Sequence, residues 1–139
     1  MPLHHHDSDQ QTTAHVALVI FQVAQYWVAL EARYVLAMTD QPQGLLKANA
    51  QTLLHADAPP HEQLPPDRWL TLNNRQRNDL TSTWQLGVNG DITLRQLPVT
   101  TMHPLPPLLQ ARRFTPALCG VAFDQHQLVL LLDARKLSP

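Results

Sequence analysis

The sequence has few of the residues that build cross-links, phosphate loops or catalytic turns. Of its 139 residues, 1 is cysteine and 4 are glycine. The single cysteine, Cys119, excludes an internal disulfide framework and a zinc site made of several cysteines, and nothing argues for an oxidising compartment. Glycine-rich phosphate loops, a Gly-x-Ser-x-Gly elbow, a Walker lysine and carboxylates at hydrolase spacing are all missing. The sequence therefore favours a protein that is not an enzyme and needs no cofactor.

Charge is also scarce, and neither sign dominates. Charged residues make up 15% of the chain, and the formal net charge is −1. Because no basic field is available to collect phosphates, nucleic acid is excluded as an expected partner. The longest apolar run, 16–21, is far shorter than the ~18 residues of a membrane span, and residues 1–11 lack the regions of a signal peptide. We therefore predict a cytoplasmic protein without membrane insertion, whose weakly charged surface is covered by a partner.

What the sequence does contain is a series of short runs rich in apolar and β-branched residues, bounded by turn residues, which is typical of β-strands. Residues 1–13 are polar and predict a flexible tail. Residues 45–56 fit either two short strands or one helix, and Asn89-Gly90-Asp91 predicts a turn between strands. Strands are expected at 15–23, 26–30, 34–38, 68–72, 83–88, 92–97, 118–123 and 128–132, with helical turns near 31–33, 104–109 and 133–137.

A proline-rich segment divides these strands into two groups. Residues 58–67 contain four prolines, which cannot donate to a β-ladder and so predict an exposed, extended connection. We divide the chain into a first subdomain at about 14–57, this crossover at 58–67, and a second subdomain at about 68–139. Short strands with regular turns usually close on themselves, so the fold class is mostly β, either paired small barrels or a folded-over sandwich.

Two groups of residues suggest chemistry, and each has a simpler interpretation. The run His4 to His6 lies in the predicted tail, where a metal site would lack fixed geometry, so no metal is assigned. Cys119 is followed by Asp124 and His126, residue types that could serve as a nucleophile and its base. Cys119 lies within an apolar strand, however, where a thiol is expected to be a small buried side chain. A core cysteine is the preferred interpretation, and a small-ligand-binding barrel or a weak cysteine-dependent enzyme is the alternative.

Three segments follow one another in the order known from one family of signalling domains. The segment Tyr26-Trp-Val-Ala-Leu-Glu-Ala-Arg-Tyr-Val-Leu36 looks like that family's Tyr-Ala-Leu strand leading to Val-x-x-Val-Leu. Trp84-Gln-Leu-Gly-Val-Asn-Gly-Asp91 is similar to its Gly-Leu-x-Val-Asp segment, with Asn89 in place of the aspartate. Leu118-Cys-Gly-Val-Ala-Phe-Asp124 and Leu128-Val-Leu-Leu-Leu-Asp-Ala-Arg-Lys-Leu137 look like its closing strands. In this order the chain resembles the CheW-like domains, which couple chemoreceptors to the histidine kinase CheA in bacterial chemosensory arrays.

One segment departs from the pattern of this family. Between the first strands and the crossover, CheW-like domains usually carry a Leu-Arg-Gly sequence within a longer stretch. Here the shorter segment 44–57 stands in its place, and Asn49 and Ala50 occupy the position of the Arg-Gly pair. The chain therefore resembles a divergent and shortened member, in which the arginine of the family's contact region is absent.

The resemblance implies two intertwined five-stranded β-barrels, the first one shortened, which present strand edges and apolar grooves to partner proteins. It implies binding to the regulatory domain of a CheA-type histidine kinase and leaves open a contact with a chemoreceptor tip. If the altered segment has removed these contacts, a self-associating homodimer is expected instead. We expect Val35→Glu to weaken kinase binding without unfolding the protein. The residues that the resemblance assigns to partner contact are Val35, Met38, Asn49, Ala50 and Gln51.

Overall fold

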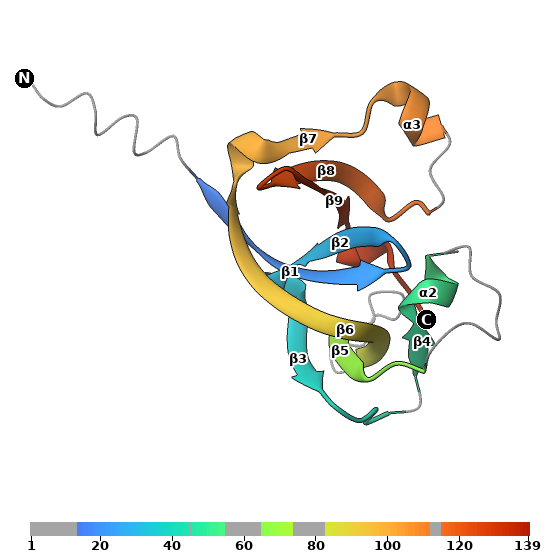
Figure 1. Cartoon of the computed structure of the whole chain (residues 1–139). Coiled ribbons are helices and arrows are strands. Elements are labelled where there is room, and N and C mark those ends of the chain that lie inside the picture. Colours follow the sequence, from blue (N-terminus) through green and yellow to red (C-terminus); the bar gives the residue numbers. More distant parts are fainter. Residues whose placement is uncertain (1–13, 45, 55–64, 74–82, 112–114) are drawn as a thin grey trace, which may run out of the picture.

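A computed structural model describes residues 14–44, 46–54, 65–73, 83–111 and 115–139 (Figure 1). The predicted tail at 1–13 and residues 58–64 of the predicted crossover lie outside the described residues. Within them the chain is mostly β-strand, which confirms the predicted fold class. The strands are β1 (His15–Val23), β2 (Tyr26–Glu31), β3 (Val35–Thr39), β4 (Lys47–Asn49), β5 (Arg68–Asn73), β6 (Thr83–Pro98), β7 (Met102–Pro104), β8 (Leu118–Asp124) and β9 (Gln127–Leu132). The helices are η1 (Ala32–Tyr34), α2 (Ala50–Leu53), η3 (Val99–Thr101), α3 (Pro107–Ala111) and η4 (Ala134–Lys136).

The described strands form one continuous path that a single long strand divides into two groups. Their order is β3-β5-β6-β1-β2-β9-β8-β7, with β4 beside β6. The first part of β6, 83–88, pairs with β5 and β4, and its second part, 89–98, pairs with β1. Figure 1 shows β6 as a long curved ribbon that passes from one group to the other. Pairing of β1 with β6 and of β3 with β5 joins chain segments from both sides of 58–67.

The turn predicted at 89–91 is wrong, because β6 runs through these residues without reversing. Gly90 has φ 79°, and the pairing of β6 with β1 shifts register between Ile20 and Gln22. The Asn-Gly sequence therefore supplies the positive φ of a bulge, which bends a strand instead of ending it. Asn89 also has a structural role, since its Nδ2 donates to the carbonyl of Pro65 at 2.6 Å. A carboxylate at this position could not make that bond.

Several local predictions are confirmed. The first and last hairpins form at the expected residues, and the helical turn before β3 is η1. The closing turn is η4, where the side chain of Asp133 accepts from the backbone N–H of Arg135. Within the predicted range 45–56, the described residues 46–54 combine the two alternatives, with the short strand β4 running directly into the short helix α2.

Alternating side chains of β1 enter two apolar clusters. Val19, Phe21 and Val23 join the larger cluster, and Leu18 and Ile20 join the smaller one. Because successive side chains of a strand point to opposite faces, β1 is buried on both sides. This two-sided burial explains why its sequence is continuously apolar rather than alternating.

The turn of the last hairpin provides a test of backbone strain. Gln125 and His126 have φ values of 51° and 72°, which residues other than glycine and asparagine rarely adopt. We expect replacing Gln125-His126 by Asn-Gly to raise the free energy of unfolding by about 1 kcal/mol, because this pair suits the turn. Chemical denaturation of both proteins measures the difference, and an unchanged or lower stability would contradict it.

Candidate partner surface

Among β3, β4, β5 and the first part of β6 (83–88), the edge strand β3 carries the most exposed apolar side chains. Leu36 and Met38 are 52% and 55% exposed, and Ala37 between them is also exposed. Figure 1 shows β3 at the end of the strand path. We define the β3 surface as Leu36, Ala37 and Met38, together with the hollow described next.

A hollow of about 320 Å³ adjoins Met38. Met38 and Ile92 supply its apolar lining, and an ion pair between Arg68 and Asp40 lies at its rim. Asp91 adds a second carboxylate, so the lining carries one more negative than positive charge. The β3 surface therefore suits an apolar side chain accompanied by a positive charge. The remaining lining residue is Thr39.

Val35 has a different environment from Met38, although both were assigned to contact. Val35 is half-buried, packs against the larger core cluster and lies opposite Leu72, which is fully buried. A glutamate here would bring a carboxylate against the core, which argues against the expectation that Val35→Glu leaves the fold intact; that expectation stays a prediction. Met38→Glu is the cleaner probe, because its side chain already reaches solvent.

The other predicted contact residues lie in and beside α2. Asn49 caps this helix, and its Oδ1 accepts from the backbone N–H of Gln51 at 3.0 Å. Ala50 is 1% exposed and belongs to the larger core cluster, so its assignment to partner contact is wrong. Alanine suits this position because the helix packs it inward, where a larger side chain would not fit. Gln51 is half-buried.

The structure separates the predicted contact residues into two groups. β3 pairs with β5, β5 with β6, and β6 with β4, so Met38 and Asn49 are three strand spacings apart. At about 4.8 Å per spacing, this separation is roughly 14 Å. The two groups lie at opposite ends of the row of four strands, β3-β5-β6-β4, and do not form one compact patch.

The buried Gln85 fixes the end of β3. Its Oε1 accepts from the backbone N–H of Gln43 at 2.5 Å, and its Nε2 lies 3.1 Å from Thr71 Oγ1 and 3.5 Å from Thr39 Oγ1. A buried amide with these partners holds β6, β5 and the residues after β3 in one arrangement. These hydrogen bonds therefore hold β3, and the β3 surface that it carries, in place.

Exposed apolar residues also occur where no contact was predicted. Phe123 and Leu128 lie opposite each other in the last hairpin, both about half exposed, and the ring of His103 lies 6.0 Å from that of Phe123. Leu94 on β6 is exposed as well. Apolar alternation predicts strands, but it does not tell which face another element covers, so no sequence pattern could identify these positions as exposed.

Cys119 is exposed, which makes the prediction of a buried cysteine wrong. The pairing of β8 with β9 shifts register between Leu118 and Gly120, so Cys119 is the extra residue of a bulge and turns away from the core. Its Sγ donates to the carbonyl of Leu131 at 3.4 Å. Asp124 lies five residue steps along the strand from it, roughly 17 Å, and His126 lies in the turn beyond. The cysteine, aspartate and histidine do not form a catalytic group.

The thiol of Cys119 can be tested directly. Partial burial of the sulfur, and next the charge of Asp133, raise its pKa above the ordinary value, which disfavours the reactive thiolate. We expect labelling in the native state, more slowly than free cysteine at neutral pH, with a rate profile shifted to higher pH. Asp133→Asn keeps the helix cap and should move the profile to lower pH. Fast labelling at neutral pH would contradict this account.

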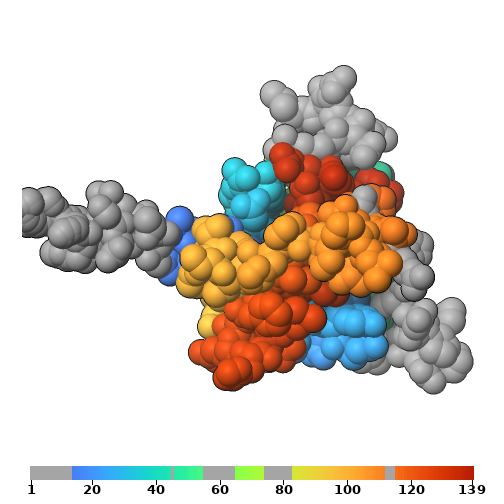
Figure 2. Space-filling view, turned by 90° about the horizontal axis from the view of Figure 1, so that it is seen from above, coloured from blue at the N-terminus to red at the C-terminus, as the bar shows by residue number. Residues whose placement is uncertain are grey.

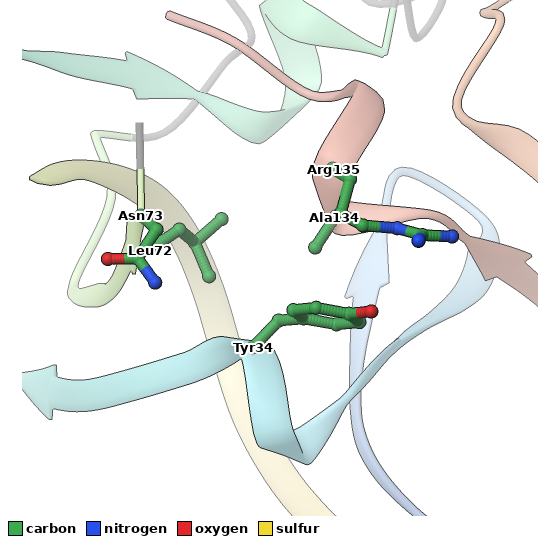
Figure 3. Close-up of a pocket in the computed structure, with 5 residues that line it drawn as sticks. All are labelled: Tyr34, Leu72, Asn73, Ala134 and Arg135. Atoms are coloured by element: carbon green, nitrogen blue, oxygen red, sulfur yellow. The ribbon is translucent and has the colours of Figure 1, made fainter. Parts of the chain in front are cut away.

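A small hollow near the C-terminus joins distant parts of the chain. It holds about 10 Å³ between Tyr34, Leu72, Asn73, Ala134 and Arg135, and Figure 3 shows the side chains of Tyr34 and Arg135 extending in the same direction, one above the other. The Arg135 guanidinium lies 5.8 Å from the centre of the Tyr34 ring. Hydrogen bonds from Arg135 lower the pKa of Asp133. This volume holds about one water molecule, so the hollow is a small gap in the packing between these segments and is too small for a ligand.

A third hollow, of about 250 Å³, lies beside the last hairpin. Arg95 and Asp124 form an ion pair of 2.7 Å across it, joining β6 to β8, and Trp27 lines another side. Because the two charges satisfy each other, the hollow does not favour the small-ligand alternative.

Within the described ranges, no three His, Cys, Asp or Glu side chains gather closely enough to hold a metal ion. His4 to His6 lie outside the described residues. In the same part of the chain, no helix has the length and apolar character needed to cross a membrane.

These features define a mostly β domain with two interleaved strand groups and an exposed apolar edge. Its fold is that of a CheW protein: the crystal structure of the scaffolding protein TtCheW from Thermoanaerobacter tengcongensis superposes with a TM-score of 0.61. The match covers 86% of this chain and 89% of that protein, at 11% sequence identity. No family model and no curated sequence matches the chain. The likeness at this identity shows the fold, which the sequence resemblance predicted.

Proposed function

We propose that the protein is a non-catalytic adaptor of a bacterial chemosensory system, working in the cytoplasm. The observation that carries the proposal is the fold, which matches a CheW scaffolding protein over most of both chains. The dispersed positions of Cys119, Asp124 and His126 favour an adaptor over an enzyme. Such a protein acts by holding partners together, so its function depends on its surfaces.

The proposed first partner is the regulatory domain of a CheA-type histidine kinase, and a chemoreceptor tip is the proposed second partner. The β3 surface supports this role because Met38 combines exposure with an adjoining hollow. Burying an exposed methionine against a partner removes apolar area from water without breaking a contact of the free protein. Asn49 and Gln51, on the far side of the four strands, form a separate contact region in this proposal.

The charge of the hollow specifies what the kinase surface should offer. Asp91 and the Asp40–Arg68 pair leave a net negative lining around the apolar wall made by Met38 and Ile92. A partner that inserts an apolar side chain and places a lysine or arginine nearby would match both features. Rim charges mainly set association rate and salt dependence, whereas the buried apolar contact sets the dissociation rate.

Calorimetric titration tests this proposal. The full chain is titrated with the regulatory domain of the CheA-type kinase from the same genome, and we expect a micromolar or tighter dissociation constant. Met38→Glu should weaken binding by roughly tenfold or more, because it places a carboxylate in a contact that loses water.

Leu128→Glu is the matched control, since Leu128 is also apolar, on a strand and 45% exposed. Figure 2 shows the β8–β9 hairpin (orange-red) and β3 (cyan) apart from each other, with the segment after β6 between them. The control should retain the affinity of the unmodified protein. Absence of saturable binding would reject the kinase as partner, and equal losses in both variants would reject the β3 surface as the contact.

A further inference from the structure

The two strands that end the sheet path differ in how they are protected against pairing. β7 has three residues, includes Pro104 and carries His103, and short edges with proline resist the addition of another strand. β3 has five residues without proline or charge, and within the described residues only β5 pairs with it. The pairing of β3 with β5 shifts register between Val35 and Ala37, so Leu36 is an extra residue there, and from Ala37 to Thr39 the pairing is regular.

The sequence of this edge is self-complementary. An antiparallel pair of two β3 strands with a two-fold axis at Ala37 places Leu36 of each copy opposite Met38 of the other. Both side chains are more than half exposed in the single chain. Such an arrangement is the isologous contact that a symmetric dimer requires. We propose that a second copy of this chain adds its β3 to the open edge, which extends the sheet across two molecules.

The charges near the ends of β3 do not oppose this register. Arg33, in η1, forms an ion pair with Glu31, and Asp40, just after β3, forms one with Arg68. Because each of these charges already has a partner in its own chain, the alignment is set by the apolar residues at its centre.

The interface goes beyond the proposed function and does not depend on it. Pairing would cover Met38, so a self-paired molecule could not use this side chain to bind the kinase. A five-residue strand gives a small contact, and small interfaces are typical of weak, reversible association. The two proposals have separate readouts: association of the protein alone for this one, and titration with the kinase domain for the other.

Sedimentation velocity over a wide concentration range tests the self-association. We expect the mass to rise from 15.7 kDa toward twice that value with concentration. Met38→Lys should weaken dimerisation roughly tenfold or more, because lysine on an edge strand opposes pairing and the symmetric contact contains the substitution twice. Leu128→Lys, on the distant hairpin, should dimerise like the unmodified protein.

Disulfide cross-linking tests the alignment. In a Cys119→Ser background, Ala37→Cys places one thiol on the two-fold axis. Opposed residues of an antiparallel pair have Cα atoms about 4.5–5.5 Å apart, within the range that a disulfide spans. Mild oxidation should give a covalent dimer of Ala37→Cys and leave Leu128→Cys monomeric. A protein monomeric at all concentrations, or one that cross-links through position 128 but not 37, would overturn the proposal without affecting kinase binding.

Discussion

Gly87→Ala is expected to lower the free energy of unfolding by about 2–3 kcal/mol, because the site has no room for a methyl group. A Cβ at position 87 would lie 2.6 Å from Cγ of Pro66 and 2.9 Å from Cζ3 of Trp69. The proline ring and the indole are both stiff, so relief requires movement of the backbone. Gly87 lies in β6 opposite Trp69, and the substitution would push β6 and β5 away from the end of the proline-rich segment.

Gly44→Ala is the control for this prediction. Its added Cβ would meet no atom within 4 Å, so its unfolding free energy should stay within about 0.5 kcal/mol of the original. Urea denaturation followed by tryptophan fluorescence measures all three proteins. Equal stability of Gly87→Ala and Gly44→Ala would mean that Pro66 does not pack on β6 as described.

The hairpins could be predicted because their information is local. Two apolar runs separated by only two or four residues leave few alternatives to an antiparallel pair, and both the first and last hairpin form at the expected residues. Which strands pair with each other, in contrast, cannot be predicted from the local sequence. β2 pairs in parallel with β9 although about a hundred residues lie between them, and no residue pattern specifies such a partner.

Bulges account for two of the errors. Asn89-Gly90 favours a positive φ, which serves a turn or a bulge equally, and only the length of the paired strand β1 decides between them. At Cys119, alternation along an apolar strand predicts burial, but one extra residue in β8 turns the side chain outward. A single-residue register shift is enough to reverse the exposure of a side chain.

The candidate surface was predictable only in part. Alternation around β3 indicated an apolar strand, but the exposure of Met38 depends on β3 being the last strand of the path. Val35 faces the core because it lies opposite Leu72, and Ala50 is buried because the short helix α2 packs on the larger cluster. These distinctions arise from tertiary neighbours. The assignment of Val35, Met38, Asn49 and Gln51 to partner contact stays a prediction.

Trp84→Ala should be among the most damaging substitutions, with an expected loss of about 3–5 kcal/mol. Trp84 is 1% exposed and belongs to the larger core cluster, where the sheet group around β3 meets the rest of the fold. Removing the indole would leave a cavity beside Leu72, which lies opposite it on β5. The loss would therefore reach the strand that supports β3.

Trp84→Phe should lower the free energy of unfolding by much less than the loss of ring volume suggests. The indole Nε1 is buried and has no hydrogen-bond partner among the residues that the structure describes, a condition that costs the folded protein roughly 1–3 kcal/mol. Phenylalanine removes this donor while keeping most of the apolar contact, so the two effects oppose each other. We expect a change of about 1 kcal/mol or less in chemical denaturation. If Trp84→Phe were as destabilising as Trp84→Ala, the indole N–H would have to donate a strong hydrogen bond in the folded protein, which would contradict its description as a buried donor without a partner.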